Sequence, residues 1–140
     1  MLNETIILII AYFGVFIGKY LYVVAEEEVK VGKRNLVIFQ NIMFIFALVW
    51  FLFLMRENLL LAIPIVLGLL ILGDMLKNFY VILGFLLGID FNFVLSVLIF
   101  ICGLPTGSLM MNKDATHVFR KTWLFLLFGL LGLIASKFLF

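Results

Sequence analysis

The chain has 140 residues, of which 66% are hydrophobic and 13% charged, and its formal net charge is +2. Ordinary soluble domains are about half apolar and about a quarter charged, and a small soluble chain keeps too much surface to hide this many apolar side chains. The composition therefore excludes a soluble domain and predicts an all-α, polytopic integral membrane protein whose solvent is the lipid bilayer. The small net charge is spread over several polar stretches, so we expect no binding of nucleic acid.

The first two apolar segments cover residues 5–24 and 36–55. Each has about the 20 residues that a helix needs to cross about 30 Å of hydrocarbon. In the first segment, Gly14 and Gly18 are four residues apart and give a face on which another helix could approach closely. Between the two segments, residues 25–35 form the most polar stretch of the chain, and we expect a solvated loop there.

Two shorter apolar segments follow, at residues 59–73 and 75–89. A helix of about 15 residues is near 22 Å long, which is short for a full crossing. The two segments are therefore either tilted short spans or a partly re-entrant hairpin that other helices shield from lipid. Asp74 separates them and is placed to pair with Lys77. An ionisable residue at membrane depth is a functional candidate by default, so Asp74 is retained as a candidate solute-binding residue.

Residues 91–111 and 122–140 complete a set of six membrane segments in a single transmembrane domain that covers the whole chain. With the N-terminus outside, eight basic residues would lie on the cytoplasmic side, namely Lys19, Lys30, Lys33, Arg34, Lys77, Lys113, Arg120 and Lys121. Only Arg56 and Lys137 would lie outside. This distribution follows the positive-inside rule. It predicts a multi-pass cell-membrane protein with both termini outside and its basic loops in the cytoplasm.

The strongest functional candidate is the stretch "ICGLPTGSLMM", which begins at residue 101. Pro105 lacks an N–H and clashes with the preceding turn of a helix, and Gly103 and Gly107 loosen the backbone on either side. Transporters commonly bind ions or solutes at such broken helices, and Thr106 and Ser108 would add hydroxyl groups. We therefore expect a proline-broken helix and a solute-binding site here. A kink satisfied by neighbouring helices, or the plain end of a span, is the alternative.

An intramembrane aspartyl protease is a remote alternative that depends on Asp74. Such enzymes carry a Gly-x-Gly-Asp motif and a second aspartate that shares one proton with the first. Here Ile71 stands where the first glycine of the motif would be. The other aspartates, Asp90 and Asp114, lie in expected turns or loops, so we do not expect an enzyme.

Four further polar or reactive residues have simpler interpretations. Cys102 is the only cysteine and His117 the only histidine, so the sequence predicts no metal site and no cofactor. Cys102 lies in an apolar run, where a buried and inert thiol is expected. Gln40 and Asn41 lie about one turn inside their segment, where we expect hydrogen bonds to other helices; a contact with substrate is the alternative.

Two stretches of the chain resemble one repeat of the transporters of the auxin-efflux-carrier and bile-acid-symporter type. They are "AYFGVFIGKYLYVVAEEEVKVGKRNLVIF" and "VLSVLIFICGLPTGSLMMNKDATHVFRKTWLFLLFGLLG". Members of that family contain two inverted repeats of about five spans each, so the resemblance implies a half-size relative whose site is completed by dimerisation. The site residues that it implies are Gly103, Pro105, Thr106 and Gly107. The six segments expected here depart from the five of such a repeat.

The sequence therefore leaves two main functions open. The first is a half-size, transporter-like protein that moves a small solute or ion as a homo-oligomer, because the chain is too small to enclose a pathway alone. The second is a non-catalytic subunit or assembly factor of a larger membrane complex. The expected partners are the lipid bilayer and either a second copy of the chain, as a homodimer, or other membrane subunits.

Overall fold

The computed structural model of the chain describes residues 2–76, 78–110 and 115–139, and these residues form a bundle of six α-helices without a strand. The helices are α1 (Leu2–Val24), α2 (Glu26–Leu54), α3 (Leu59–Leu76), α4 (Phe79–Ile89), α5 (Phe93–Leu109) and α6 (Ala115–Leu139). A short 3₁₀ turn, η1 (Arg56–Asn58), joins α2 to α3. The prediction of an all-α helical bundle is confirmed.

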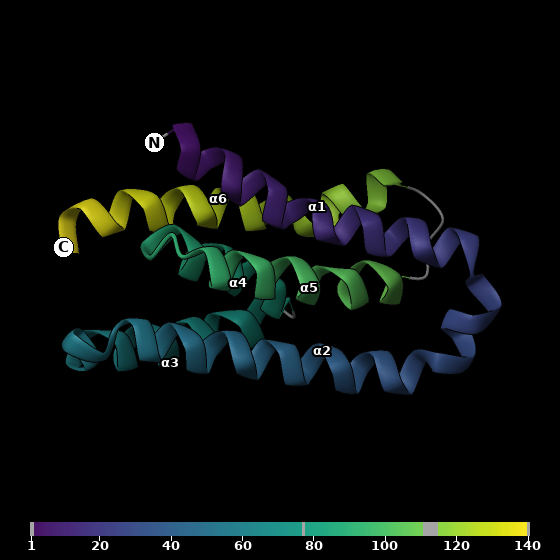
Figure 1. Cartoon of the computed structure of the whole chain (residues 1–140), viewed down its shortest axis with the longest axis horizontal. Helices are drawn as coiled ribbons and strands as arrows, with labels where there is room; N and C mark the ends of the chain where they lie inside the picture. The colour runs from purple at the N-terminus through teal and green to yellow at the C-terminus, as the bar shows by residue number, and fades with distance from the viewer. Residues whose placement is uncertain (1, 77, 111–114, 140) are drawn as a thin grey trace.

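Successive helices run in opposite directions, so that both chain termini lie toward one end of the bundle and the α1–α2 turn lies at the other (Figure 1). Four stretches are long and apolar enough to cross a membrane: Asn3–Val24, Glu26–Leu54, Arg56–Met75 and Val118–Phe138. Helices α4 and α5 are apolar but shorter. The short segment predicted at residues 75–89 is therefore confirmed, whereas the prediction that residues 59–73 are too short to cross was wrong, because the helical stretch there runs from Arg56 to Met75. This arrangement is compatible with a multi-pass membrane protein.

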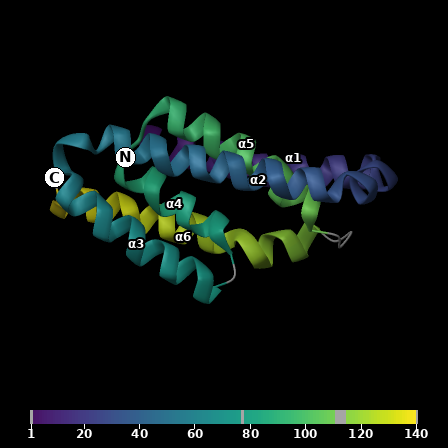
Figure 2. The same ribbon diagram turned by 90° about the horizontal axis from the view of Figure 1, so that it is seen from below.

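Helices α3 and α4 form a hairpin that stays toward the end of the bundle where the termini lie (Figures 1 and 2). Helix α4 has 11 residues, so it is about 16 Å long and too short to cross the hydrocarbon layer. Nine of its residues are buried. The chain therefore keeps this short helix away from lipid by packing protein around it.

The break between α3 and α4 falls after Leu76, so the segment boundary predicted at Asp74 was wrong by about one turn. Gly73 and Asp74 remain helical. Gly73 provides space for the start of α4, because a Cβ atom placed there would lie 3.1 Å from Cδ1 of Phe79. The N–H of Asn78 donates to the carbonyl of Gly73 over 3.2 Å, which closes the end of α3.

The bundle is built on two close helix pairs, α1 with α5 and α4 with α6. In the first pair, Gly14 and Gly18 of α1 meet the backbone of α5 at Phe100 and Leu104. In return, a Cβ atom at Gly103 of α5 would lie 2.8 Å from the N of Val15 on α1. Since lipid provides little hydrophobic drive between helices, such close backbone approach supplies the van der Waals contact that holds them together.

The second pair, α4 with α6, repeats the same arrangement. Gly84 and Gly88 of α4 meet α6 at Phe125, Gly129 and Gly132, whereas a Cβ atom at Gly129 itself would meet the side chain of Leu8 on α1. A Cβ atom at Gly88 would lie 2.9 Å from the Cα of Gly132. In both pairs, glycines four positions apart on one helix therefore let the backbone of its partner approach closely.

The expected interruption at Pro105 is not present, because α5 continues as a single helix from Phe93 to Leu109 and contains Pro105. A proline removes one N–H from the helix ladder, and here it does so in the next-to-last turn, with α1 packed along the same stretch. The glycines at 103 and 107 serve this packing and do not unwind the backbone. The prediction of a proline-broken helix was therefore wrong.

Two expected polar loops are also partly helical. Helix α2 begins at Glu26, within the stretch of residues 25–35 that was expected to be a loop, and α6 begins at Ala115. Glutamate, lysine and arginine are good helix formers, and Lys30 forms an ion pair of 2.8 Å with Glu26 one turn earlier. These helices therefore extend beyond their apolar stretches.

Candidate functional site

Most residues of the expected site around Pro105 are buried against α1. Gly103 and Gly107 lie against the α1 backbone near Val15. The hydroxyl of Ser108 lies 2.8 Å from the carbonyl oxygen of Gly18 on α1, to which it donates, and 2.9 Å from that of Leu104. These residues join α5 to α1, and their polar groups are used within the bundle.

Thr106 differs from its neighbours because it lies at a pocket. Its hydroxyl donates to the carbonyl of Cys102 over 2.8 Å and accepts a hydrogen bond of 3.0 Å from Nε2 of Gln40 on α2. The prediction that Gln40 bonds to another helix is therefore confirmed. Asn41, its neighbour, has an exposed side chain.

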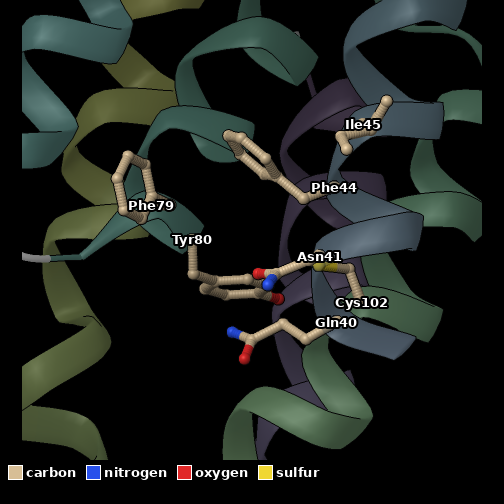
Figure 3. Close-up of a pocket in the computed structure, with 7 residues that line it drawn as sticks. All are labelled: Gln40, Asn41, Phe44, Ile45, Phe79, Tyr80 and Cys102. Carbon is tan, nitrogen blue, oxygen red and sulfur yellow. The ribbon is translucent and has the colours of Figure 1, made fainter. Parts of the chain in front are cut away.

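Two neighbouring pockets, together called here the polar pocket, lie where α2, α4, α5 and α6 meet. The first has a volume of about 390 Å³ and is lined by Gln40, Asn41, Phe44, Ile45, Phe79, Tyr80 and Cys102 (Figure 3). The second has a volume of about 430 Å³ and is lined by Gln40, Asn78, Phe79, Tyr80, Thr106, Leu109, Met110, Lys121 and Leu124. Three residues contribute to both parts, so that the parts adjoin. Small-molecule sites in proteins commonly have this size, with mostly apolar walls and a few polar groups.

Tyr80, in the first turn of α4, forms a rigid wall of the polar pocket. Its ring stacks on Phe125 of α6 at a centroid distance of 4.7 Å, and its hydroxyl donates to the carbonyl of Ala11 on α1 over 3.2 Å. The side chains of Gln40 and Asn41 on α2 point toward this ring (Figure 3). The tyrosine is only 2% exposed, so α1 and α6 fix one wall while α2 supplies the amide groups opposite.

The start of α4 supplies the most polar part of the pocket. Asn78 precedes the helix, but its side chain makes no capping bond; instead its Nδ2 donates to the carbonyl of Lys121 over 2.8 Å. Lys121 is the one charged residue among those that line the pocket. Lys121 is exposed, and its positive charge and the positive end of the α4 dipole favour a negatively charged solute over a cation.

The structure does not bring Asp74 together with the other predicted site residues. Asp74 is exposed on α3 and lines neither part of the polar pocket. Asp90 follows the far end of α4, about 12 Å of helix rise beyond Ile82, which lies against Gly73 beside Asp74, so the two carboxylates do not form a pair that shares a proton. Lys77 and Asp114 lie outside the described residues, as does the side chain of His117.

Sequence reasoning missed three residues of the polar pocket, Asn78, Tyr80 and Lys121. The polar interruption around Asn78 was a signal, because it separates two apolar segments and marks the start of α4. Nothing in the sequence connects it with Lys121, which lies 43 positions away. Cys102 lines the pocket and is buried, as expected. Among the described residues, no group of His, Cys, Asp or Glu side chains could hold a metal ion.

Comparisons of the chain with family models, with curated proteins and with solved structures found no match.

Proposed function

We propose that this chain is a small membrane transporter-like protein that binds a polar solute in the polar pocket and moves it across the bilayer. The observation that carries this proposal is the pocket itself, which gathers amide, hydroxyl and ammonium groups in an otherwise apolar bundle. It lies where the chain reverses between α3 and α4. Sites at the ends of short or interrupted helices are a common design in transporters, because helix ends offer unpaired backbone groups to a solute.

The proposed solute is small and either neutral or anionic. Gln40 offers an amide to both parts of the pocket, and Lys121 offers a positive charge to one of them. Tyr80 and Phe79 provide flat apolar surfaces between these groups. A cation would be disfavoured beside the ammonium group and the N-terminus of α4.

The proposal includes a homo-oligomer, in which a second copy helps to enclose the pathway. Helix α2 supports this part, because only 11% of its most apolar window is buried within the chain. Its outer face carries Phe46, Val49 and Phe53, which are 56–60% exposed. We further propose that both termini lie outside the cell and the α1–α2 turn lies in the cytoplasm, in accordance with the positive-inside rule.

The proposal is tested by solute entry into proteoliposomes, measured as osmotic swelling by stopped-flow light scattering with glycerol, urea, alanine and lactate. At least one solute should enter faster than it enters protein-free liposomes. Gln40→Leu should slow that entry, because it removes the amide that both parts of the pocket share. Ile42→Ala is the matched control, since Ile42 is exposed on α2 and lines neither part of the pocket.

Equal rates in wild-type and protein-free liposomes for every solute would count against transport, as would identical rates in wild type and Gln40→Leu. Under the second function, a subunit of a larger membrane complex, the exposed face of α2 would contact a different protein. Gentle extraction would then recover a stoichiometric partner, whereas the transporter proposal expects copies of this chain alone.

A further inference from the structure

The first turns of α2 carry an ordered sequence of charges beyond the apolar part of the helix. Glu26, Glu27 and Glu28 come first, followed by a basic turn of Lys30, Lys33 and Arg34, and then by apolar residues from Leu36 onward. This end of α2 lies at the α1–α2 turn, opposite the chain termini (Figure 1). Acidic, basic and apolar groups therefore succeed one another along a single helix that could cross the membrane.

The basic side chains share one face of the helix with apolar residues. A shallow open groove of about 660 Å³ is lined by Lys30, Val31, Lys33, Arg34, Val37 and Ile38. The basic residues are exposed, and Val37 and Ile38 are 39% and 48% exposed one to two turns farther along. Lys30 is held by its ion pair with Glu26, which leaves Lys33 and Arg34 as the principal charges offered to a ligand.

The dimensions of this groove fit the boundary of a bilayer. The interfacial layer on each side of the hydrocarbon is about 5–7 Å thick, and the helix rises about 6 Å from Lys30 to Arg34. With Val37 and Ile38 among the acyl chains, the basic turn lies at the depth of the lipid phosphates. The glutamates then lie farther out, in water, where salt weakens their repulsion of an anionic headgroup.

We propose that Lys33 and Arg34, together with Lys30, bind the headgroup of an anionic phospholipid such as phosphatidylglycerol. A phosphate accepts hydrogen bonds from both lysine and arginine. The apolar residues that continue the groove would contact the first part of an acyl chain, which a free phosphate ion does not possess. This site lies on the outer face of α2 and is separate from the polar pocket.

The test uses purified full-length protein in neutral detergent, with bound phosphatidylglycerol and phosphatidylcholine counted by native mass spectrometry. Wild type should prefer phosphatidylglycerol. Each basic residue near an anionic lipid contributes about a fivefold preference, so Lys33→Gln/Arg34→Gln should lower the preference by about 25-fold. Both positions are exposed, and circular dichroism of the variant checks that its helices remain folded.

Two control variants make the result specific. Arg56→Gln/Lys137→Gln removes the same number of charges at the opposite end of the bundle and should leave the preference unchanged. Glu27→Gln/Glu28→Gln removes acidic groups beside the basic turn and should strengthen the preference for phosphatidylglycerol. An unchanged preference in Lys33→Gln/Arg34→Gln would overturn the proposal.

Two further outcomes would also overturn it. If inorganic phosphate displaces phosphatidylglycerol at equal concentration, the groove binds an anion from water and the acyl chain has no part. If Lys33→Gln/Arg34→Gln dissociates an oligomer while lipid preference persists, the basic turn contacts the glutamates of a second copy. For a headgroup site we expect that only molar salt displaces phosphatidylglycerol and that the oligomer stays intact.

Discussion

A methyl group added at Gly107 should separate α1 from α5 and destabilise the whole bundle. The new Cβ atom would press on the carbonyl oxygen of Val15 and lie 2.8 Å from the N of Lys19, against an ordinary contact distance of at least 3.4 Å. The helices would therefore have to move apart by at least about 0.6 Å to clear Lys19 and by more to clear Val15, a gap that forfeits about a quarter to a half of each dispersion contact. Movement of α1 would also weaken the hydrogen bond from Ser108 to Gly18.

The expected magnitude follows from these terms. Overpacking between close helices costs about 1–3 kcal/mol, and a weakened hydrogen bond costs up to about 1 kcal/mol. The higher helix propensity of alanine offsets about 1 kcal/mol of this destabilisation. We therefore expect Gly107→Ala to lower the free energy of unfolding by about 2 kcal/mol.

The measurement is reversible unfolding in mixed detergent and dodecyl sulfate, followed by circular dichroism. Gly68→Ala is the matched control, because Gly68 lies in α3 with nothing within 4 Å of its added Cβ atom. That variant should be as stable as wild type or more stable by up to about 1 kcal/mol. If Gly107→Ala were as stable as Gly68→Ala, the close packing of α5 on α1 would be refuted.

Two other predictions concern a single hydrogen bond and a single carboxyl group. A double-mutant cycle of Gln40→Leu and Thr106→Val should give a coupling energy of about 0.6 kcal/mol, typical of bonds between membrane helices; a value near zero would show that the bond does not form. Burial raises the pKa of the Asp90 carboxyl, in the α4–α5 turn, above its ordinary value of 3.8. The folded protein then binds that proton more tightly than the unfolded chain, so stability should rise as pH falls through the raised pKa and level off below 3.8. Asp90→Asn should abolish this rise, whereas Asp74→Asn at an exposed position should preserve it.

The helical nature of the six apolar segments could be predicted because it depends on runs of apolar residues that the sequence displays directly, whereas the four stretches long enough to cross a membrane could not all be identified. Their ends were less accurate. The charged residues at the start of α2 are compatible with either a loop or a helix. The ion pair between Glu26 and Lys30 stabilises the helix there. Periodicity of apolar residues cannot detect this extension, since the residues concerned face water.

The interpretation of Gly103, Pro105 and Gly107 needed the partner helix. Glycine and proline can break a helix, but glycines four residues apart also let two backbones approach. The face of Gly14 and Gly18 was visible in the sequence, yet nothing there showed that it meets α5. The polar pocket could not be predicted for the same reason, because its walls come from four helices that are distant in the chain.

The most direct test of the central claim is water access to the polar pocket within the membrane. Single cysteines at Gln40 and at Ile42, in a Cys102→Ala background, would be treated in proteoliposomes with a membrane-impermeant thiol reagent. The two positions lie about 200° apart around α2, so they differ in direction while lying at nearly equal depth. We predict rapid labelling of Gln40→Cys and slow labelling of Ile42→Cys; equally slow labelling at both positions would contradict a solute pocket that opens to water.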